Sequence, residues 1–224
     1  MSTTFFLESR EIQSECSTPK ASLHTYQQQR QAQSRAAKEL LVGALARLHI
    51  PQDTLIRHNA RWTIGDQRIP SIAISHADTW VQCAVDTHFP IGIDIESTLR
   101  RIDVQHALEH FLHPQIDSIL NHASGAQNRR AFFMIWTMLE AQGKVLNLDL
   151  NASLYQKLFA TSGGVISPPS DHPAHRFFVR WLSPNHVSSV FCHATRASEL
   201  RARGWDLLHD TSALLRLSQI TQTL

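Results

Sequence analysis

The stretch Pro90-Ile91-Gly92-Ile93-Asp94-Ile95-Glu96 has the alternating pattern of a β-strand and ends in two carboxylates. Successive side chains of a strand point to opposite faces, so the isoleucines share one face, and Gly92, Asp94 and Glu96 share the other. We expect the isoleucine face to be core. Two carboxylates, with a glycine that leaves room beside them, suit a magnesium ion whose remaining ligands are phosphate oxygens. The simpler interpretation is that Asp94 and Glu96 only end the strand.

The composition is that of a folded globular protein. The chain has 224 residues, of which 42% are hydrophobic and 18% charged, and this is enough for one large domain or two small ones. The net charge of +2 does not by itself indicate nucleic-acid binding. No apolar run reaches the roughly 20 residues of a membrane span, and the first residues lack the pattern of a secretory signal. We therefore expect a cytoplasmic protein with neither membrane nor nucleic acid as a partner.

The cysteines suggest neither a disulfide framework nor a zinc cluster. They are Cys16, Cys83 and Cys192, an odd number of widely separated residues. Cys83 and Cys192 lie in apolar runs that resemble strands, so we interpret them as small core residues.

The order of the expected elements indicates an α+β fold. A helix is expected at Leu23–His49 and another from Asn128 to about Leu146, each with a regular apolar stripe. The expected strands are Thr54–Ile64, Ser71–His76, Trp80–Asp86, Phe89–Ile95, Phe177–Leu182 and Val187–His193, and the short connections between neighbours favour antiparallel hairpins.

Helix followed by antiparallel hairpin occurs twice along the chain. We therefore expect two similar halves with flanking helices, related by a pseudo-twofold axis. They are residues 1–96 and 97–224.

Two helices carry the remaining candidate residues. Trp136, Glu140 and Lys144 follow at spacings of four and share one stripe, although Glu140 and Lys144 could be only a surface ion pair. On the earlier helix, Arg35 and Lys38 are three apart and could both reach one phosphate, although a solvated face is the simpler interpretation.

Taken together, these motifs resemble the 4′-phosphopantetheinyl transferases. The motifs, in order, are Ser75-His76, Trp80-Val81, Cys83-Ala84, Asp86, the stretch 90–96, Trp136-Thr137 and Glu140-Ala141 followed by Lys144. The chain is most similar to the long, surfactin-type and enterobactin-type members, in which two similar halves are fused. The resemblance is close over about 71–96 and 129–144, and elsewhere it concerns only the order of elements.

The resemblance implies an enzyme that moves the phosphopantetheine arm of coenzyme A to a serine of an apo acyl or peptidyl carrier protein. Magnesium is the implied cofactor, 3′,5′-ADP the second product, and a monomer the implied state. Asp94, Glu96 and Glu140 would hold the metal. Lys144 would lie beside the pyrophosphate and stabilise or protonate the leaving group. The base for the carrier serine could be Glu140 or a metal-bound water.

The resemblance also implies residues that contact coenzyme A. His76 would bind a phosphate, with Ser75 beside it, and Arg35 or Lys38 would supply a cation from the early helix. Arg68 is the candidate for a lysine that the family has before the Ser-His strand, where this chain is stretched over 65–70.

At two positions the chain departs from the family by losing a charge. Leu139 stands where the family usually has lysine, and Gln115 where it has a glutamate. A non-catalytic relative that binds coenzyme A or a carrier protein is therefore the alternative. An interaction protein whose basic helix binds nucleic acid is the candidate from another class.

Overall fold

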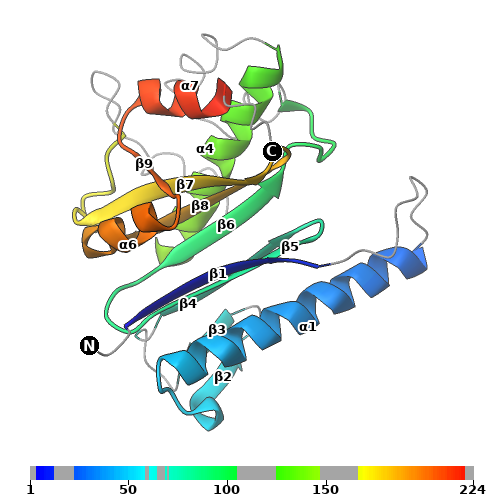
Figure 1. The fold of residues 1–224 in the computed structure, drawn as a ribbon, viewed down its shortest axis with the longest axis vertical. Coiled ribbons are helices and arrows are strands. Elements are labelled where there is room, and N and C mark those ends of the chain that lie inside the picture. The colour runs from blue at the N-terminus through cyan, green and yellow to red at the C-terminus, as the bar shows by residue number, and fades with distance from the viewer. Residues whose placement is uncertain are drawn as a thin grey trace.

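The protein is built from four layers, helix on sheet on sheet on helix, as Figure 1 shows. The computed structural model describes residues 4–12, 23–58, 61–64, 69, 71–104, 125–146 and 166–219. Helix α1 (Leu23–Arg47) covers the outer face of the first sheet, and α4 (Gly125–Leu146) with α7 (Thr211–Gln219) covers the outer face of the second. The α+β prediction is thereby confirmed.

The two sheets are antiparallel throughout their hydrogen-bonded pairs. The first has the order β1-β5-β4 and the second β6-β8-β7-β9, while β2 and β3 form a separate hairpin. The strands are β1 (Phe5–Glu11), β2 (Leu55–His58), β3 (Arg61–Ile64), β4 (Ser71–Ala77), β5 (Trp80–Asp86), β6 (Gly92–Ser97), β7 (His175–Ser183), β8 (His186–His193) and β9 (Asp206–Leu208). The short helices are 3-10 turns at Gln52–Thr54 and Ala194–Arg196 and helix α6 (Ala197–Ala202).

The apolar stripe predicted on helix α1 is buried. It consists of small and aliphatic residues that recur at helical spacing from Ala36 to Leu48 and pack against β1 and β5. The helix ends because His49 adopts a positive φ of 57° and the amide of Ile50 donates back to the Leu45 carbonyl at 2.9 Å. Pro51 then prevents the helix from continuing.

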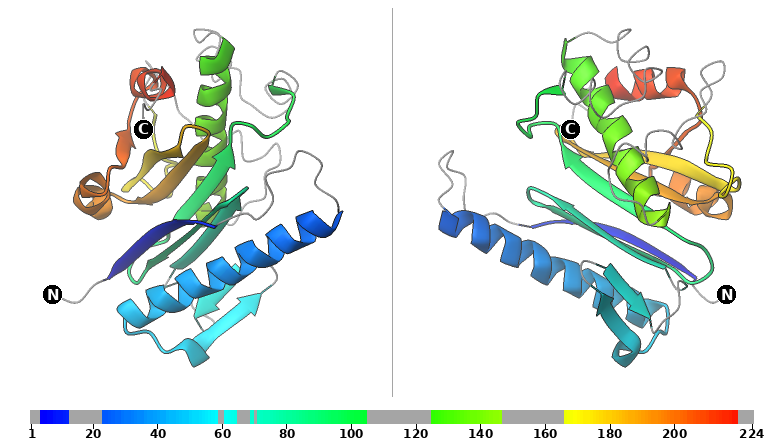
Figure 2. Two further views of the ribbon diagram at one scale, coloured as in Figure 1. Left: turned by 45° about the vertical axis from the view of Figure 1, so that its right-hand side comes forward. Right: turned by 180° about the vertical axis from the view of Figure 1, so that it is seen from behind.

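An apolar core lies between each pair of neighbouring layers. Leu41 and Cys83 belong to the core between α1 and the first sheet. Ile93 and Phe178 belong to the core between the two sheets, and Phe132 to the core between the second sheet and α4. Cys83 and Cys192 are buried free thiols, as expected for small core residues. Strand β6 therefore has one face in the central core and the other against α4, an arrangement visible in both views of Figure 2.

Three sequence-based expectations need correction. Thr54–Ile64 is not one strand but the β2–β3 hairpin. Strand β6 begins at Gly92, later than predicted, and pairs with β8 instead of forming a hairpin with β5. The helix expected from Asn128 begins three residues earlier, since α4 starts at Gly125. The sequence also predicts two helices between Val104 and Ile119 and a loose segment over 153–172, and all of these except Val104 and residues 166–172 lie outside the described residues.

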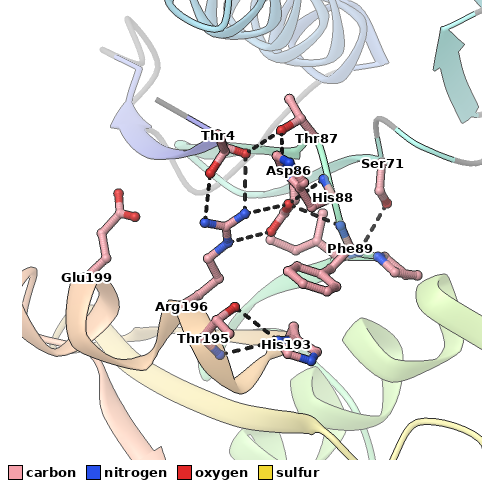
Figure 3. A network of polar contacts seen from close by, with 12 residues as sticks. Thr4, Ser71, Asp86, Thr87, His88, Phe89, His193, Thr195, Arg196 and Glu199 are labelled. Atoms are coloured by element: carbon pink, nitrogen blue, oxygen red, sulfur yellow. Dashed lines mark hydrogen bonds and ion pairs between the residues drawn. The ribbon is translucent and has the colours of Figure 1, made fainter. Parts of the chain in front are cut away.

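The connection between the sheets is held by a buried ion pair, shown in Figure 3. Asp86, fully buried at the end of β5, accepts hydrogen bonds from the amides of His88 and Phe89 at 2.9 and 3.2 Å. Arg196 donates to both Asp86 oxygens at 2.8 Å and also to the Thr4 hydroxyl at 3.0 Å. The pair therefore links the beginning of the chain, the end of β5 and the segment after β8.

Among the described helices, none combines the length and apolarity needed to cross a membrane.

Candidate functional site

The site is built where β6 passes under helix α4. A Cβ added to Gly92 would lie 1.8 Å from the Ala141 carbonyl oxygen, so only glycine permits this approach of strand and helix. The expectation that Gly92 leaves room for a ligand is wrong, because the backbone of α4 occupies that space. The close packing instead brings the acidic face of β6 beside the Glu140 and Lys144 stripe.

Asp94 is the centre of the site. Its side chain is buried, and its Oδ1 accepts hydrogen bonds from the Ser75 hydroxyl at 2.8 Å and from the Lys144 ammonium at 2.9 Å. Lys144 also donates to the Ile93 carbonyl at 2.8 Å. The second oxygen, Oδ2, is buried and has no hydrogen-bond partner within the part of the chain that the structure describes. A buried carboxylate oxygen without a partner is costly, so Oδ2 is open to a cation or a donor.

The stripe predicted on α4 is its one partly exposed face between residues 131 and 144. Trp136, Glu140 and Lys144 are half-buried there, while every other residue of that range is buried. Lys144 forms its ion pair with Asp94 on β6, and not the surface pair with Glu140 that was the simpler interpretation.

Burial and the charge of Asp94 raise the pKa of two further carboxylates. Burial and then repulsion from Asp94 raise the pKa of Glu96 to about 7, against the opposing effect of Arg100, whose guanidinium lies 2.6 Å from the Glu96 carboxylate. The same two causes raise the pKa of Glu140 to about 7, although Lys144 lowers it. Three carboxylates therefore share one region in which their full ionisation is unfavourable.

This donor set fits a divalent cation in its chemistry. Hard carboxylate oxygens are what magnesium prefers, and a cation here would relieve the repulsion and give Asp94 Oδ2 a partner. Within the described ranges, no three histidine, cysteine, aspartate or glutamate side chains already converge as a metal cluster.

His76 lies on β4, one residue after Ser75, and its side chain is exposed. Partial burial lowers the pKa of His76, and the positive charges of Lys144 and Arg30 lower it further. The tip of the β4–β5 hairpin is held against α1, since Gln29 and Gln33 both donate to the Asp78 carbonyl, at 2.9 and 2.8 Å. This contact brings the second and third turns of α1, which include Arg30, close to the end of β4 that carries His76.

The other predicted coenzyme A contacts are distributed differently. Arg35 and Lys38 are exposed on α1, further along the helix than Arg30. Ser75 is buried, and its hydroxyl is bonded within the protein. Arg68 lies outside the described residues.

One of the two departures from the family can be located. Leu139 is fully buried in the core between α4 and the second sheet, so this position contributes packing rather than charge. Gln115 lies outside the described residues.

Arg30 and Arg100 are charged residues near the site that the sequence reasoning missed. Arg30 lies on the same helix as Arg35 and Lys38, and the contact of this helix with the β4–β5 hairpin identifies it as the cation near His76. Arg100 follows Glu96 by four residues, a spacing that could have suggested the ion pair.

The fold and the site together define the class of this protein. It is a two-sheet α+β protein in which a lysine holds a buried aspartate beside two glutamates of raised pKa. The family model of the 4′-phosphopantetheinyl transferase superfamily matches residues 90–202, which contain β6, α4 and β8. The chain belongs to this superfamily.

A curated relative supports the same family. The chain is 40% identical over 85 residues to "4'-phosphopantetheinyl transferase gsp" of Aneurinibacillus migulanus. The match covers 35% of this chain and spans about a third, 34%, of the relative's length.

Proposed function

We propose that the protein transfers the 4′-phosphopantetheine arm of coenzyme A to a serine of an apo carrier protein, with magnesium, and releases 3′,5′-ADP. The observation that carries the proposal is the arrangement around Asp94. The buried Asp94 carboxylate is held by Lys144, has one oxygen without a partner among the described residues, and lies near two further carboxylates with raised pKa values. Family membership supplies the reaction.

In this proposal Asp94, Glu96 and Glu140 would hold the metal. When bound, magnesium neutralises the pyrophosphate of coenzyme A and makes its phosphorus easier to attack. The side chains of the protein would then orient the pyrophosphate and transfer protons.

The carrier serine oxygen forms a bond to the β-phosphorus of coenzyme A while the bond from that phosphorus to the bridging oxygen of 3′,5′-ADP breaks. Glu140, on the half-exposed stripe of α4, takes the proton of the serine. Lys144 would exchange its contact with Asp94 for the pyrophosphate and stabilise the charge of the departing ADP. No oxidant or further reactant is needed, since the arm simply changes its oxygen partner.

For the nucleotide end of coenzyme A, His76 is the proposed phosphate contact. Its exposed ring lies within reach of the positive charge of Arg30, so this edge of β4 is suited to an anion. Arg35 and Lys38, exposed further along α1, are the other candidate cations for coenzyme A.

We also propose that the chain is a monomer made of two fused, pseudo-twofold halves. In each half a strand precedes a long helix, and a later hairpin pairs with the strand through its second member, giving the orders β1-β5-β4 and β6-β8-β7. This repeat divides the chain within residues 87–91, just before β6, rather than after Glu96. The candidate site then lies where the halves meet, within a single chain.

The proposal is tested by incubating the protein with coenzyme A, magnesium and a panel of apo fatty-acid, polyketide and peptide carrier proteins. Intact-mass spectrometry should show one carrier gaining the mass of a single phosphopantetheine arm. No gain on any carrier, with coenzyme A binding intact by titration calorimetry, would instead support the non-catalytic relative that the charge losses at Leu139 and Gln115 suggest.

A further inference from the structure

The hydroxyl of Ser75 connects the two sheets at the candidate site. Ser75 lies on β4, an edge strand of the first sheet, and Asp94 lies on β6, an edge strand of the second. The backbone ladders do not join these strands. Instead, serine side chains of β4 accept amide hydrogens of the β6 segment, Ser71 from Ile91 at 3.1 Å and Ser75 from Ile95 at 3.2 Å.

The direction of the Ser75 hydroxyl proton follows from these contacts. The Ile95 amide can only donate, so the Ser75 oxygen accepts there and its proton is free to point elsewhere. The Asp94 Oδ1 atom lies 2.8 Å away and accepts it. Ser75 is only 7% exposed, so its hydroxyl is committed within the protein.

These bonds determine which Asp94 oxygen is available. Oδ1 already accepts from Ser75 and from Lys144, while Oδ2 has no partner within the described residues. If Lys144 moves to a phosphate, Ser75 remains as the donor that keeps Oδ1 occupied and fixes the rotation of the carboxylate.

We propose that Ser75 is a positioning residue for Asp94, which aims Oδ2 at the metal, and is not a ligand of coenzyme A. This inference rests on the proposed function, in which Asp94 holds magnesium. Removing a partner that orients a metal ligand in this way commonly lowers the metal affinity by about 10- to 100-fold.

Ser71 provides a matched control on the same strand. Its hydroxyl accepts the amide of Ile91, just before β6, four residues earlier on the same face of β4, and it makes no hydrogen bond to a carboxylate among the described residues. Ser71→Ala therefore removes the same kind of strand-to-strand bond and leaves Asp94 untouched. Ser75→Thr keeps the hydroxyl and serves as the rescue variant.

The test measures Mn²⁺ binding, by the loss of its free electron paramagnetic resonance signal, in the presence of coenzyme A. Coenzyme A binding is measured separately by calorimetry in a chelator, without metal. We expect Ser75→Ala to weaken Mn²⁺ binding by about tenfold or more, with coenzyme A affinity unchanged within about twofold. Ser71→Ala should change neither affinity, and Ser75→Thr should restore Mn²⁺ binding. Should Ser75→Ala fail to fold by circular dichroism, Ser75→Cys, which keeps the size with a weaker donor, replaces it.

The proposal is overturned if Ser75→Ala leaves Mn²⁺ binding intact, or if its main effect is a loss of metal-free coenzyme A affinity. The wild-type protein binding no Mn²⁺ would overturn it together with the metal assignment. If Ser75→Ala weakens Mn²⁺ binding as expected but the wild-type protein loads no carrier, only the proposed transfer is rejected.

Discussion

Replacing Gly92 by alanine should destabilise the protein because strand β6 and helix α4 touch at this residue. The added Cβ would lie 1.8 Å from the Ala141 carbonyl oxygen and 2.8 Å from its carbonyl carbon, where ordinary contact begins at 3.4 Å. The obstacle is helix backbone, so it cannot rotate away as a side chain would. Strand and helix must therefore separate by more than an ångström, at the point where the site is assembled.

The expected cost is about 3 kcal/mol or more, at the upper end of the range for overpacked cores. Since each kcal/mol lowers Tm by roughly 2–4 °C in a chain of this size, the expected shift is roughly 6–12 °C. Gly43→Ala is the matched control: Gly43 lies in α1, and its added Cβ would meet nothing within 4 Å. That change should stabilise the protein by about 0.5–1 kcal/mol, because alanine favours the helix.

Urea unfolding followed by circular dichroism measures both free energies of unfolding. Gly92→Ala should also impair carrier loading in the fraction that stays folded, because Asp94 is displaced relative to Lys144. If Gly92→Ala is as stable as the wild-type protein, with an unchanged dependence on urea, the close approach of β6 and α4 is refuted.

Further predictions concern the joint between the sheets, pH and the metal. Arg196→Ala should lower the free energy of unfolding in urea by about 3–5 kcal/mol, because it leaves the Asp86 carboxylate buried and uncompensated. Arg10→Ala, which breaks an exposed ion pair, should lower it by less than about 1 kcal/mol. Equal losses in the two variants would refute the role of burial. Burial lowers the pKa of His175 to about 4 from its ordinary value of 6.5, so between these pH values the unfolded chain binds more protons and the free energy of unfolding falls as the pH falls. Between about pH 7.5 and about pH 4.5, the free energy of unfolding should therefore fall by roughly 2–3 kcal/mol less in His175→Phe than in the wild-type protein. Identical pH profiles of the two proteins would contradict this. Asp94→Ala should abolish transfer while keeping the far-ultraviolet circular dichroism spectrum, and retained transfer would show that the metal assignment is wrong.

Local patterns predicted the elements that carry the site. The alternation over residues 91–96 predicted a strand with an apolar face and an acidic face. The isoleucine face is buried as expected, while the acidic face packs against α4 and leaves Glu96 half-buried. The spacing of Trp136, Glu140 and Lys144 predicted the stripe that stays half-buried between residues 131 and 144 of α4. Such patterns succeed because period and burial are properties of a single element.

Contacts between distant elements could not be predicted in this way. The short connection after Asp86 favoured a hairpin, but the buried carboxylate holds the amides of His88 and Phe89 and the chain crosses to the second sheet. Strand β6 pairs with β8, which lies roughly 90 residues later, and no local period encodes that choice. The space beside Gly92 was misassigned for the same reason, since its occupant is a helix distant in sequence.

The central claim is that this chain moves the arm of coenzyme A to a carrier serine at the site around Asp94. The most direct measurement follows two products of one reaction, the 3′,5′-ADP released and the carrier serine modified, the second located by tandem mass spectrometry. We predict that the two appear in equal amounts with the wild-type protein and that neither appears with Asp94→Ala. Release of 3′,5′-ADP without a modified serine, or equal products from both proteins, would contradict the account.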